Sequence, residues 1–144
     1  MIYVLDACAL IALLNGEAGN EKIDELFVKA QAGKITLVMS IINLLEVYYG
    51  YVRDESRQKA IDILAPLYET RLKIVDRISP FVYDEAARLK AVYRCSLADA
   101  IGIATAAEIS GQFVTSDHHE LETIAEQEAA RFFWFRCKHN QHAE

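Results

Sequence analysis

The sequence predicts an α/β protein of three layers, α/β/α, around a mainly parallel central sheet of about five strands. Short apolar runs rich in β-branched residues alternate with longer segments of helical periodicity, which is typical of a parallel sheet covered on both faces. The 144 residues are 53% hydrophobic and 25% charged, enough for one domain with its own core. No linker-like stretch divides the chain. We therefore expect one domain over residues 1–136 and a flexible tail at 137–144.

Each expected element follows from a local pattern. The strands are apolar runs at residues 2–5, 35–38, 72–75, 112–115 and 131–135. The helices are apolar or amphipathic segments at residues 7–14, 21–32, 41–52, 54–67, 80–94, 97–110 and 121–128. Ser40, Ser79 and Ser96 can cap three of these helices, and Pro66 should shorten the fourth. In such a sheet, ligands bind beyond the carboxyl ends of the strands.

Four acidic residues fall where that edge of the sheet is expected. Asp6 directly follows the first strand, and Asp117 follows the fourth strand by two residues. Asp99 lies in the first turn of the sixth helix. Glu46 lies inside an otherwise apolar helix, where it shares one face with Asn43 three residues earlier. These positions make the four carboxylates candidates for one site.

Each carboxylate also has a structural explanation. Asp6, Asp99 and Asp117 could cap helices, and the stripe of Asn43 and Glu46 could face solvent. The four together are harder to explain in this way, because carboxylates about 4 Å apart repel strongly. Such a cluster must raise some pKa values or recruit a cation. An all-oxygen ligand set suits Mg²⁺ or Mn²⁺, which can activate water for phosphodiester hydrolysis.

Four segments resemble the motifs of a known family in their order and spacing. They are MIYVLDACALIALL, SIINLLEVYYG, SLADAIGIATA and FVTSDHHE. Together they resemble PIN domains, and the second closely resembles the corresponding motif of the VapC-type toxins in that family. The resemblance implies a PIN-like fold and a metal-dependent endoribonuclease with Mg²⁺ or Mn²⁺ as cofactor. It assigns Asp6, Glu46, Asp99 and Asp117 as catalytic residues and metal ligands, with Asn43 in support.

The same resemblance implies partners. They are an RNA substrate, the cognate antitoxin protein of a type II toxin–antitoxin pair, and a second copy of the chain in a homodimer. From the residues themselves, the helix pair 21–32 and 55–69 could form a groove for an amphipathic partner segment.

One position departs from the family pattern. PIN domains often carry Ser or Thr shortly after the first Asp, but Ala7 and Cys8 stand there in this chain. A thiol is a poor ligand for a hard ion, although its small size fits the space. Thr115 and Ser116 flank Asp117, and either hydroxyl could support metal or phosphate binding or could simply end a strand.

The residues after Asp117 have simpler explanations. Adjacent residues on a helix do not face one point, so His118 and His119 are expected on the surface. Glu120 could extend the acidic site, but capping the start of its helix is the favoured role.

The charge of the chain opposes a nucleic-acid substrate. The net charge is −6 and the pI is about 5.2, whereas phosphate affinity normally comes from Lys and Arg. Subtracting the four site carboxylates from −6 leaves −2, so much of the excess would belong to a cation site. The main alternative is a catalytically inactive PIN-fold module that binds RNA or protein. An aspartyl-phosphate protein is disfavoured, because Cys8 stands where a DxD motif has its second Asp.

The sequence also indicates a location. No apolar run reaches the roughly 18–20 residues that span a membrane, and the N-terminus lacks the pattern of a secretory leader. The three cysteines have no CxxC spacing, which predicts reduced thiols. We therefore expect a cytoplasmic protein that does not contact membranes.

Overall fold

The computed structural model describes residues 1–138, and its elements follow the predicted order. The strands are β1 (Ile2–Leu5), β2 (Thr36–Ser40), β3 (Lys73–Val75), β4 (Gln112–Thr115) and β5 (Arg131–Trp134). The helices are α1 (Ala7–Asn15), α2 (Asn20–Gln31), α3 (Ile41–Asp54), α4 (Arg57–Leu64), the 3-10 helix η1 (Ala65–Glu69), α5 (Pro80–Val92), α6 (Leu97–Glu108) and α7 (His118–Gln127). Residues 139–144 of the predicted tail lie outside the described part of the chain.

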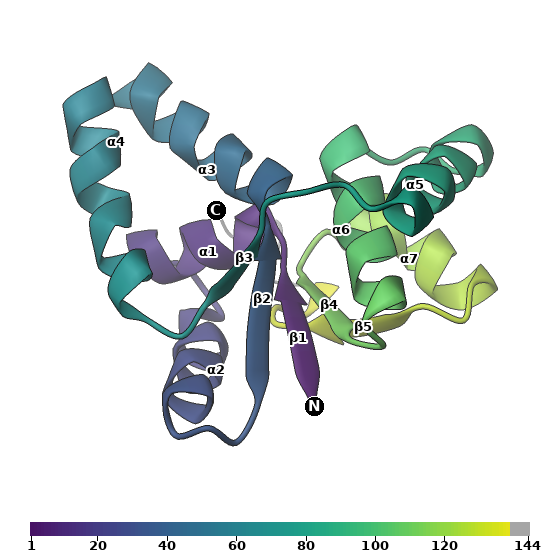
Figure 1. The fold of residues 1–144 in the computed structure, drawn as a ribbon, viewed down its shortest axis with the longest axis horizontal. Helices are drawn as coiled ribbons and strands as arrows, with labels where there is room; N and C mark the ends of the chain where they lie inside the picture. The colour runs from purple at the N-terminus through teal and green to yellow at the C-terminus, as the bar shows by residue number, and fades with distance from the viewer. Residues whose placement is uncertain (139–144) are drawn as a thin grey trace.

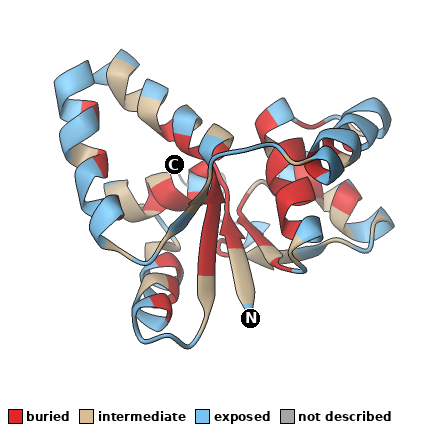
Figure 2. Ribbon diagram, viewed as in Figure 1, coloured by how far each residue is buried: buried red, intermediate tan, exposed pale blue. Residues whose placement is uncertain are grey.

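The five strands form one parallel sheet in the order β3-β2-β1-β4-β5, which confirms the predicted α/β/α architecture. Helices α1 to α4 lie on one side of this sheet, and α5, α6 and α7 lie on the other (Figure 1). Successive strand residues point to opposite faces. Leu5 therefore packs into the core beneath α1, α2 and α3, whereas Val4 packs beneath α5 and α6. The buried parts of the chain gather in the central strands and in α6 (Figure 2). This order places β1 and β4 side by side at the centre of the sheet.

Two helices begin three residues away from their predicted starts, and both differences come from capping. Helix α4 does not begin at Asp54, which ends α3. It begins after Ser56, whose hydroxyl accepts a hydrogen bond from the Lys59 N–H at 3.1 Å. Helix α7 begins at His118 rather than at 121, because the Asp117 carboxylate caps its first turn. None of the helices within residues 1–138 combines the length and the apolar character needed to cross a bilayer.

Helix α3 leaves a stripe of apolar side chains exposed, although Leu44 and Val47 on another side are buried in the core. Ile41, Leu45 and Tyr49, spaced four residues apart, are 36%, 51% and 52% exposed. Asn43 is fully buried, and its Nδ2 donates to the Ala98 carbonyl at 3.4 Å. The interpretation of Asn43 as part of a solvent-facing stripe is therefore wrong, because this side chain joins α3 to the start of α6.

Helix α6 is the most deeply buried helix of the fold, and Gly102 allows its close approach to the sheet. A Cβ atom at this position would lie 2.9 Å from Cζ of the buried Phe113 and 3.0 Å from Oδ1 of Asn43. The small residues that surround it along α6 have the same effect. The packing of α6 therefore fixes where its N-terminal turn, which carries Asp99, meets the edge of the sheet.

Gly102→Ala is expected to lower the free energy of unfolding by about 1–3 kcal/mol, because the added methyl overpacks a rigid core. Gly50→Ala is the matched control, since Gly50 lies inside α3 with no atom within 4 Å of a built Cβ. The Gly50→Ala substitution should stabilise the protein by about 0.5–1 kcal/mol, because Ala has a higher helix propensity than Gly. Denaturant unfolding of both variants measures this difference, and a shift of the same sign in both would contradict the packing described.

Candidate metal centre

The carboxyl ends of β1 and β4 hold the first of the predicted site residues. The Asp6 backbone N–H donates to the Val114 carbonyl at 3.1 Å, so Asp6 is tied to β4 by the sheet itself. Its carboxylate is 2% exposed and accepts a hydrogen bond from the Ala9 N–H at 2.7 Å. Asp6 therefore caps α1, the structural role that the sequence allowed for it. It also lies at the edge of the sheet where ligands are expected to bind.

Thr115 connects the two aspartates that follow these strands. Its hydroxyl is fully buried, hydrogen-bonds to the Asp6 carboxylate and accepts from the Asp117 N–H at 3.2 Å. Ser116 is also buried, and its carbonyl accepts from the His118 N–H at 2.9 Å. The hydroxyl of Thr115, one of the two considered from the sequence, is therefore in contact with the acidic residues.

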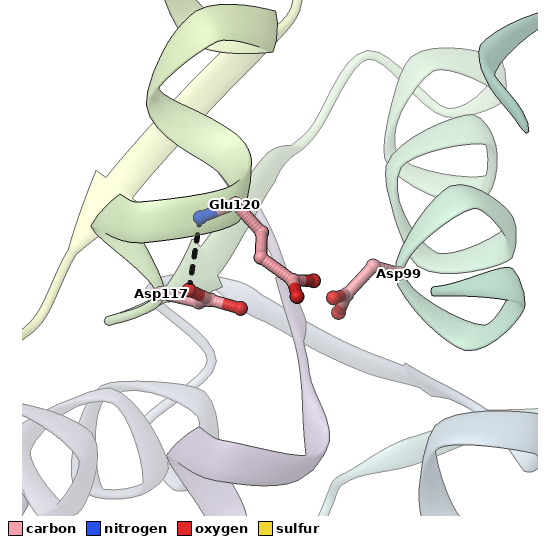
Figure 3. Close-up of side chains that lie close together, drawn as sticks. All are labelled: Asp99, Asp117 and Glu120. Carbon is pink, nitrogen blue, oxygen red and sulfur yellow. Dashed lines mark hydrogen bonds between the residues drawn. The ribbon is translucent and has the colours of Figure 1, made fainter. Parts of the chain in front are cut away.

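Three carboxylates come close to one another above this edge. Oxygens of Asp99, Asp117 and Glu120 lie within 4.8 Å of one another. Figure 3 shows Asp99 reaching in from α6, while Asp117 and Glu120 approach from the first turn of α7. The Asp117 carboxylate accepts from the Glu120 N–H at 3.2 Å, and the Asp99 N–H donates to the Ser96 hydroxyl at 3.0 Å. The first turn of each helix is therefore capped while carboxylate oxygens face one another.

Glu120 is the residue that the sequence interpretation undervalued. Its contribution to capping comes from its backbone N–H, so its side chain stays available for the cluster. The sequence did contain a signal, because residues three apart at the start of a helix share one face. Glu120 and Asp117 have that spacing.

Charge and burial shift the acid–base behaviour of the site. The pKa of Asp6 is raised to about 7, chiefly by burial and also by the charges of Asp99 and Asp117, while hydrogen bonds from Thr115 and Ala9 oppose the rise. The pKa of Asp99 is raised to about 6, chiefly by burial and also by the charges of Asp117, Glu46 and Glu120, while the hydrogen bond with Ser96 opposes the rise.

Glu46 belongs to the same electrostatic neighbourhood. Its own pKa is raised by burial, and its charge acts on Asp99. The structure thus brings the four predicted acids into electrostatic contact, although Asp6 and Glu46 lie outside the tight group of three.

Cys8 lies at the exposed surface of the site. The surrounding protein desolvates the thiol, and this raises its pKa. The charges of Asp6, Asp99, Asp117 and Glu46 raise the pKa as well. A thiol held in its protonated form is neither a good nucleophile nor a ligand for a hard cation. This disfavours covalent catalysis by Cys8 and leaves the carboxylates as the chemistry of the site.

The donor set fits a divalent cation. The clustered atoms are carboxylate oxygens, which Mg²⁺ and Mn²⁺ prefer, and the described ion pairs all involve other residues. The raised pKa values show a need for positive charge that such an ion would satisfy.

The sequence matches the family model of the PIN domain over residues 3–127, so the chain belongs to the PIN domain family. This confirms the resemblance inferred from the four motifs. No curated protein matches the chain in sequence at a significant level.

Solved structures match the fold at low sequence identity. DNA-bound VapBC from Salmonella typhimurium has a TM-score of 0.75 at 18% identity, covering 94% of this chain and 99% of its own. VapBC2 from Rickettsia felis, bound to a promoter DNA fragment, has a TM-score of 0.71 at 19% identity, covering 92% of this chain and 98% of that one. VapC20 from Mycobacterium tuberculosis, a toxin that cleaves the sarcin-ricin loop, has a TM-score of 0.59 at 20% identity. The match covers 78% of this chain and 85% of that one.

The raised pKa of Asp6 predicts that the metal-free protein loses stability as pH rises. Between its ordinary value of 3.8 and its folded value of about 7, the folded state binds more protons than the unfolded state, so the free energy of unfolding falls with increasing pH. Asp6→Asn can keep the α1 cap and removes this titration. Relative to wild type, the variant should gain about 2 kcal/mol between roughly pH 5 and pH 7.5.

The measurement is denaturant unfolding in the presence of a chelator. Taking the difference between variant and wild type at each pH cancels the titration of groups that do not interact with Asp6, and leaves that of Asp6 with its coupling to Asp99 and Asp117. Parallel pH profiles for the two proteins would contradict the assigned pKa of Asp6.

Proposed function

We propose that this PIN domain is a metal-dependent endoribonuclease that hydrolyses RNA phosphodiester bonds. The observation that carries the proposal is the group of Asp99, Asp117 and Glu120, whose oxygens lie within 4.8 Å of one another beside the buried Asp6. Membership of the PIN domain family and the toxin that cleaves the sarcin-ricin loop among the matched folds support it.

Asp6, Glu46, Asp99 and Asp117, joined by Glu120, would hold Mg²⁺ or Mn²⁺. When bound, the ion supplies positive charge for a phosphodiester and for its transition state, and it lowers the pKa of water. Thr115 orients Asp6 and Asp117 relative to each other through its two hydrogen bonds. Asn43 joins α3 to α6 and so sets Glu46 beside Asp99. Cys8 fills space at the surface of the site without taking part in the reaction.

The ionisation of the site sets the conditions for its activity. Asp6 and Asp99 must lose their protons to bind a cation, and their pKa values of about 7 and about 6 make that step sensitive to neutral pH. Metal affinity should therefore rise as the pH increases through this range.

We further propose that the chain is the toxin of a type II pair and that its antitoxin binds beside α3 and α4. Several matched structures are toxin–antitoxin complexes. A hollow of about 270 Å³ lies here, lined by Tyr48, Ile61, Leu64, Ala65 and Tyr68. Ile61 and Tyr68 are 43% and 72% exposed, as expected of a surface that an apolar helix face covers. This surface uses α4 and η1, half of the helix pair suggested by the sequence. A homodimer and a cytoplasmic location stay predictions.

Asp99→Asn and Asp117→Asn should each lower Mn²⁺-dependent cleavage of an RNA pool by at least about 100-fold, since even outer-shell losses cost metal sites 10–100-fold. Glu120→Gln should lower it by about tenfold, because the capping N–H is kept and only the carboxylate is changed. Asp84→Asn is the control, an exposed carboxylate on α5 outside the site.

The same proteins decide between a nuclease and an inactive binding module. A module would cleave no RNA with Mg²⁺ or Mn²⁺ and would give no calorimetric heat with Mn²⁺ that depends on Asp99. That pair of results would overturn the proposed activity.

Ile61→Asp should weaken binding of the antitoxin encoded beside this chain by at least about tenfold, because a charge replaces a central apolar contact. RNA cleavage should stay unchanged, since Ile61 lies on α4 away from the acidic group. Val92→Asp is the control, an apolar residue 63% exposed on α5. Calorimetric titration gives the affinities, and equal losses in both variants would place the antitoxin elsewhere.

A further inference from the structure

His118 was expected on the surface from the sequence, but in the structure it is half-buried and makes specific contacts. It is the first residue of α7, directly after the cap Asp117 and two residues before Glu120. Its ring is half-buried and stacks on Trp134 of β5, with centroids 4.0 Å apart and an interplanar angle of 19°. Its neighbour His119 is exposed.

The ring is also held by a hydrogen bond. Its Nε2 lies 2.9 Å from the Arg136 carbonyl oxygen, and because a carbonyl only accepts, Nε2 carries the hydrogen. Arg136 is itself fixed, since it is 9% exposed and its Nε donates to the Ala18 carbonyl at 2.9 Å. His118 thus joins α7 to the end of β5 and, through Arg136, to the loop after α1.

Trp134 offers a rigid surface for this stack. Its indole also stacks on Phe132, with centroids 5.3 Å apart and an interplanar angle of 13°. In the sheet, Trp134 lies opposite Thr115, the residue that contacts both Asp6 and Asp117. The stack is therefore built on the strand pair that carries the acidic site.

The rest of α7 is held in a different way. Leu121 and Ile124 are fully buried and fix the body of the helix against the core. Its first turn carries the two carboxylates, Asp117 and Glu120, and lies at the partly exposed edge of the site. The repulsion between these carboxylates and Asp99 favours their separation, so this turn needs an anchor of its own.

We propose that His118 is a positioning residue of the acidic site: its stack on Trp134 and its hydrogen bond to Arg136 hold Asp117 and Glu120 at a separation from Asp99 that one cation can bridge. This inference rests on the proposed metal site. It assigns His118 no role as a ligand or as a proton carrier.

The first test uses the metal-free protein. Amide hydrogen exchange of Glu120 and Leu121, whose N–H groups donate to Asp117, reports the opening of the first turn of α7. His118→Ala should speed this exchange by about 10- to 100-fold, since a ring stack and a hydrogen bond each contribute up to roughly one tenfold factor. His118→Phe keeps the stack and should lie between. His119→Ala should match wild type, and unchanged exchange in α6 shows that each variant is folded.

The second test is Mn²⁺ affinity by calorimetry on the same proteins. His118→Ala should bind Mn²⁺ about tenfold more weakly, as expected for loss of an outer-shell partner, and His118→Phe should recover part of that loss. His119→Ala should again match wild type.

The outcomes separate the two proposals. Unchanged exchange in His118→Ala, or faster exchange with unchanged Mn²⁺ affinity, would overturn the positioning role while leaving the metal site in place. A wild-type protein that binds no Mn²⁺ would overturn both the metal site and the role of His118 in it.

Discussion

The confinement of carboxylates at one end of the sheet, where burial and then mutual repulsion oppose their ionisation, is the constraint on which this site depends. Asp6 is almost fully buried, and Asp99, Asp117 and Glu120 crowd together above it. None of the ion pairs between described residues involves these four. The folded chain therefore carries a free-energy cost at neutral pH that only protons or a cation relieve. Such a cost is expected at a functional site, where stability is given up for binding.

The surrounding scaffold positions the aspartates by fixing the backbone that carries them, so their short side chains have little conformational freedom. Asp6 is tied to β4 by a ladder hydrogen bond, and Thr115 then bonds to the side chain of Asp6 and to the backbone of Asp117. Asp99 is set by the packing of α6, which Gly102 allows to lie close to Phe113. Short carboxylates on fixed backbone are suited to a cation site, because little conformational entropy is lost when the ion binds.

The parts of the structure that could be predicted from the sequence depend on local signals. Strands and helices alternate visibly, serine caps mark helix starts, and Asp6 directly follows a strand, so the fold and the edge of the site were predictable. The features that were missed depend on contacts between distant segments. Glu120 joins the cluster because of how α7 is rotated, and His118 is half-buried because β5, 16 residues later in the chain at Trp134, supplies a ring. Asn43 is buried because α6 packs on its side of α3.

The acidic charge of the chain is compatible with an RNA substrate once the location of that charge is considered. A net charge of −6 spread evenly would repel a phosphate backbone. Here several of the negative charges face one point, and a divalent cation placed there cancels two of them and attracts phosphate. Under the proposed activity, the affinity for RNA would then depend on cation occupancy more than on surface Lys and Arg. Under the proposed activity, the chain would have little general affinity for nucleic acid, and its attraction for phosphate would be strongest where hydrolysis takes place.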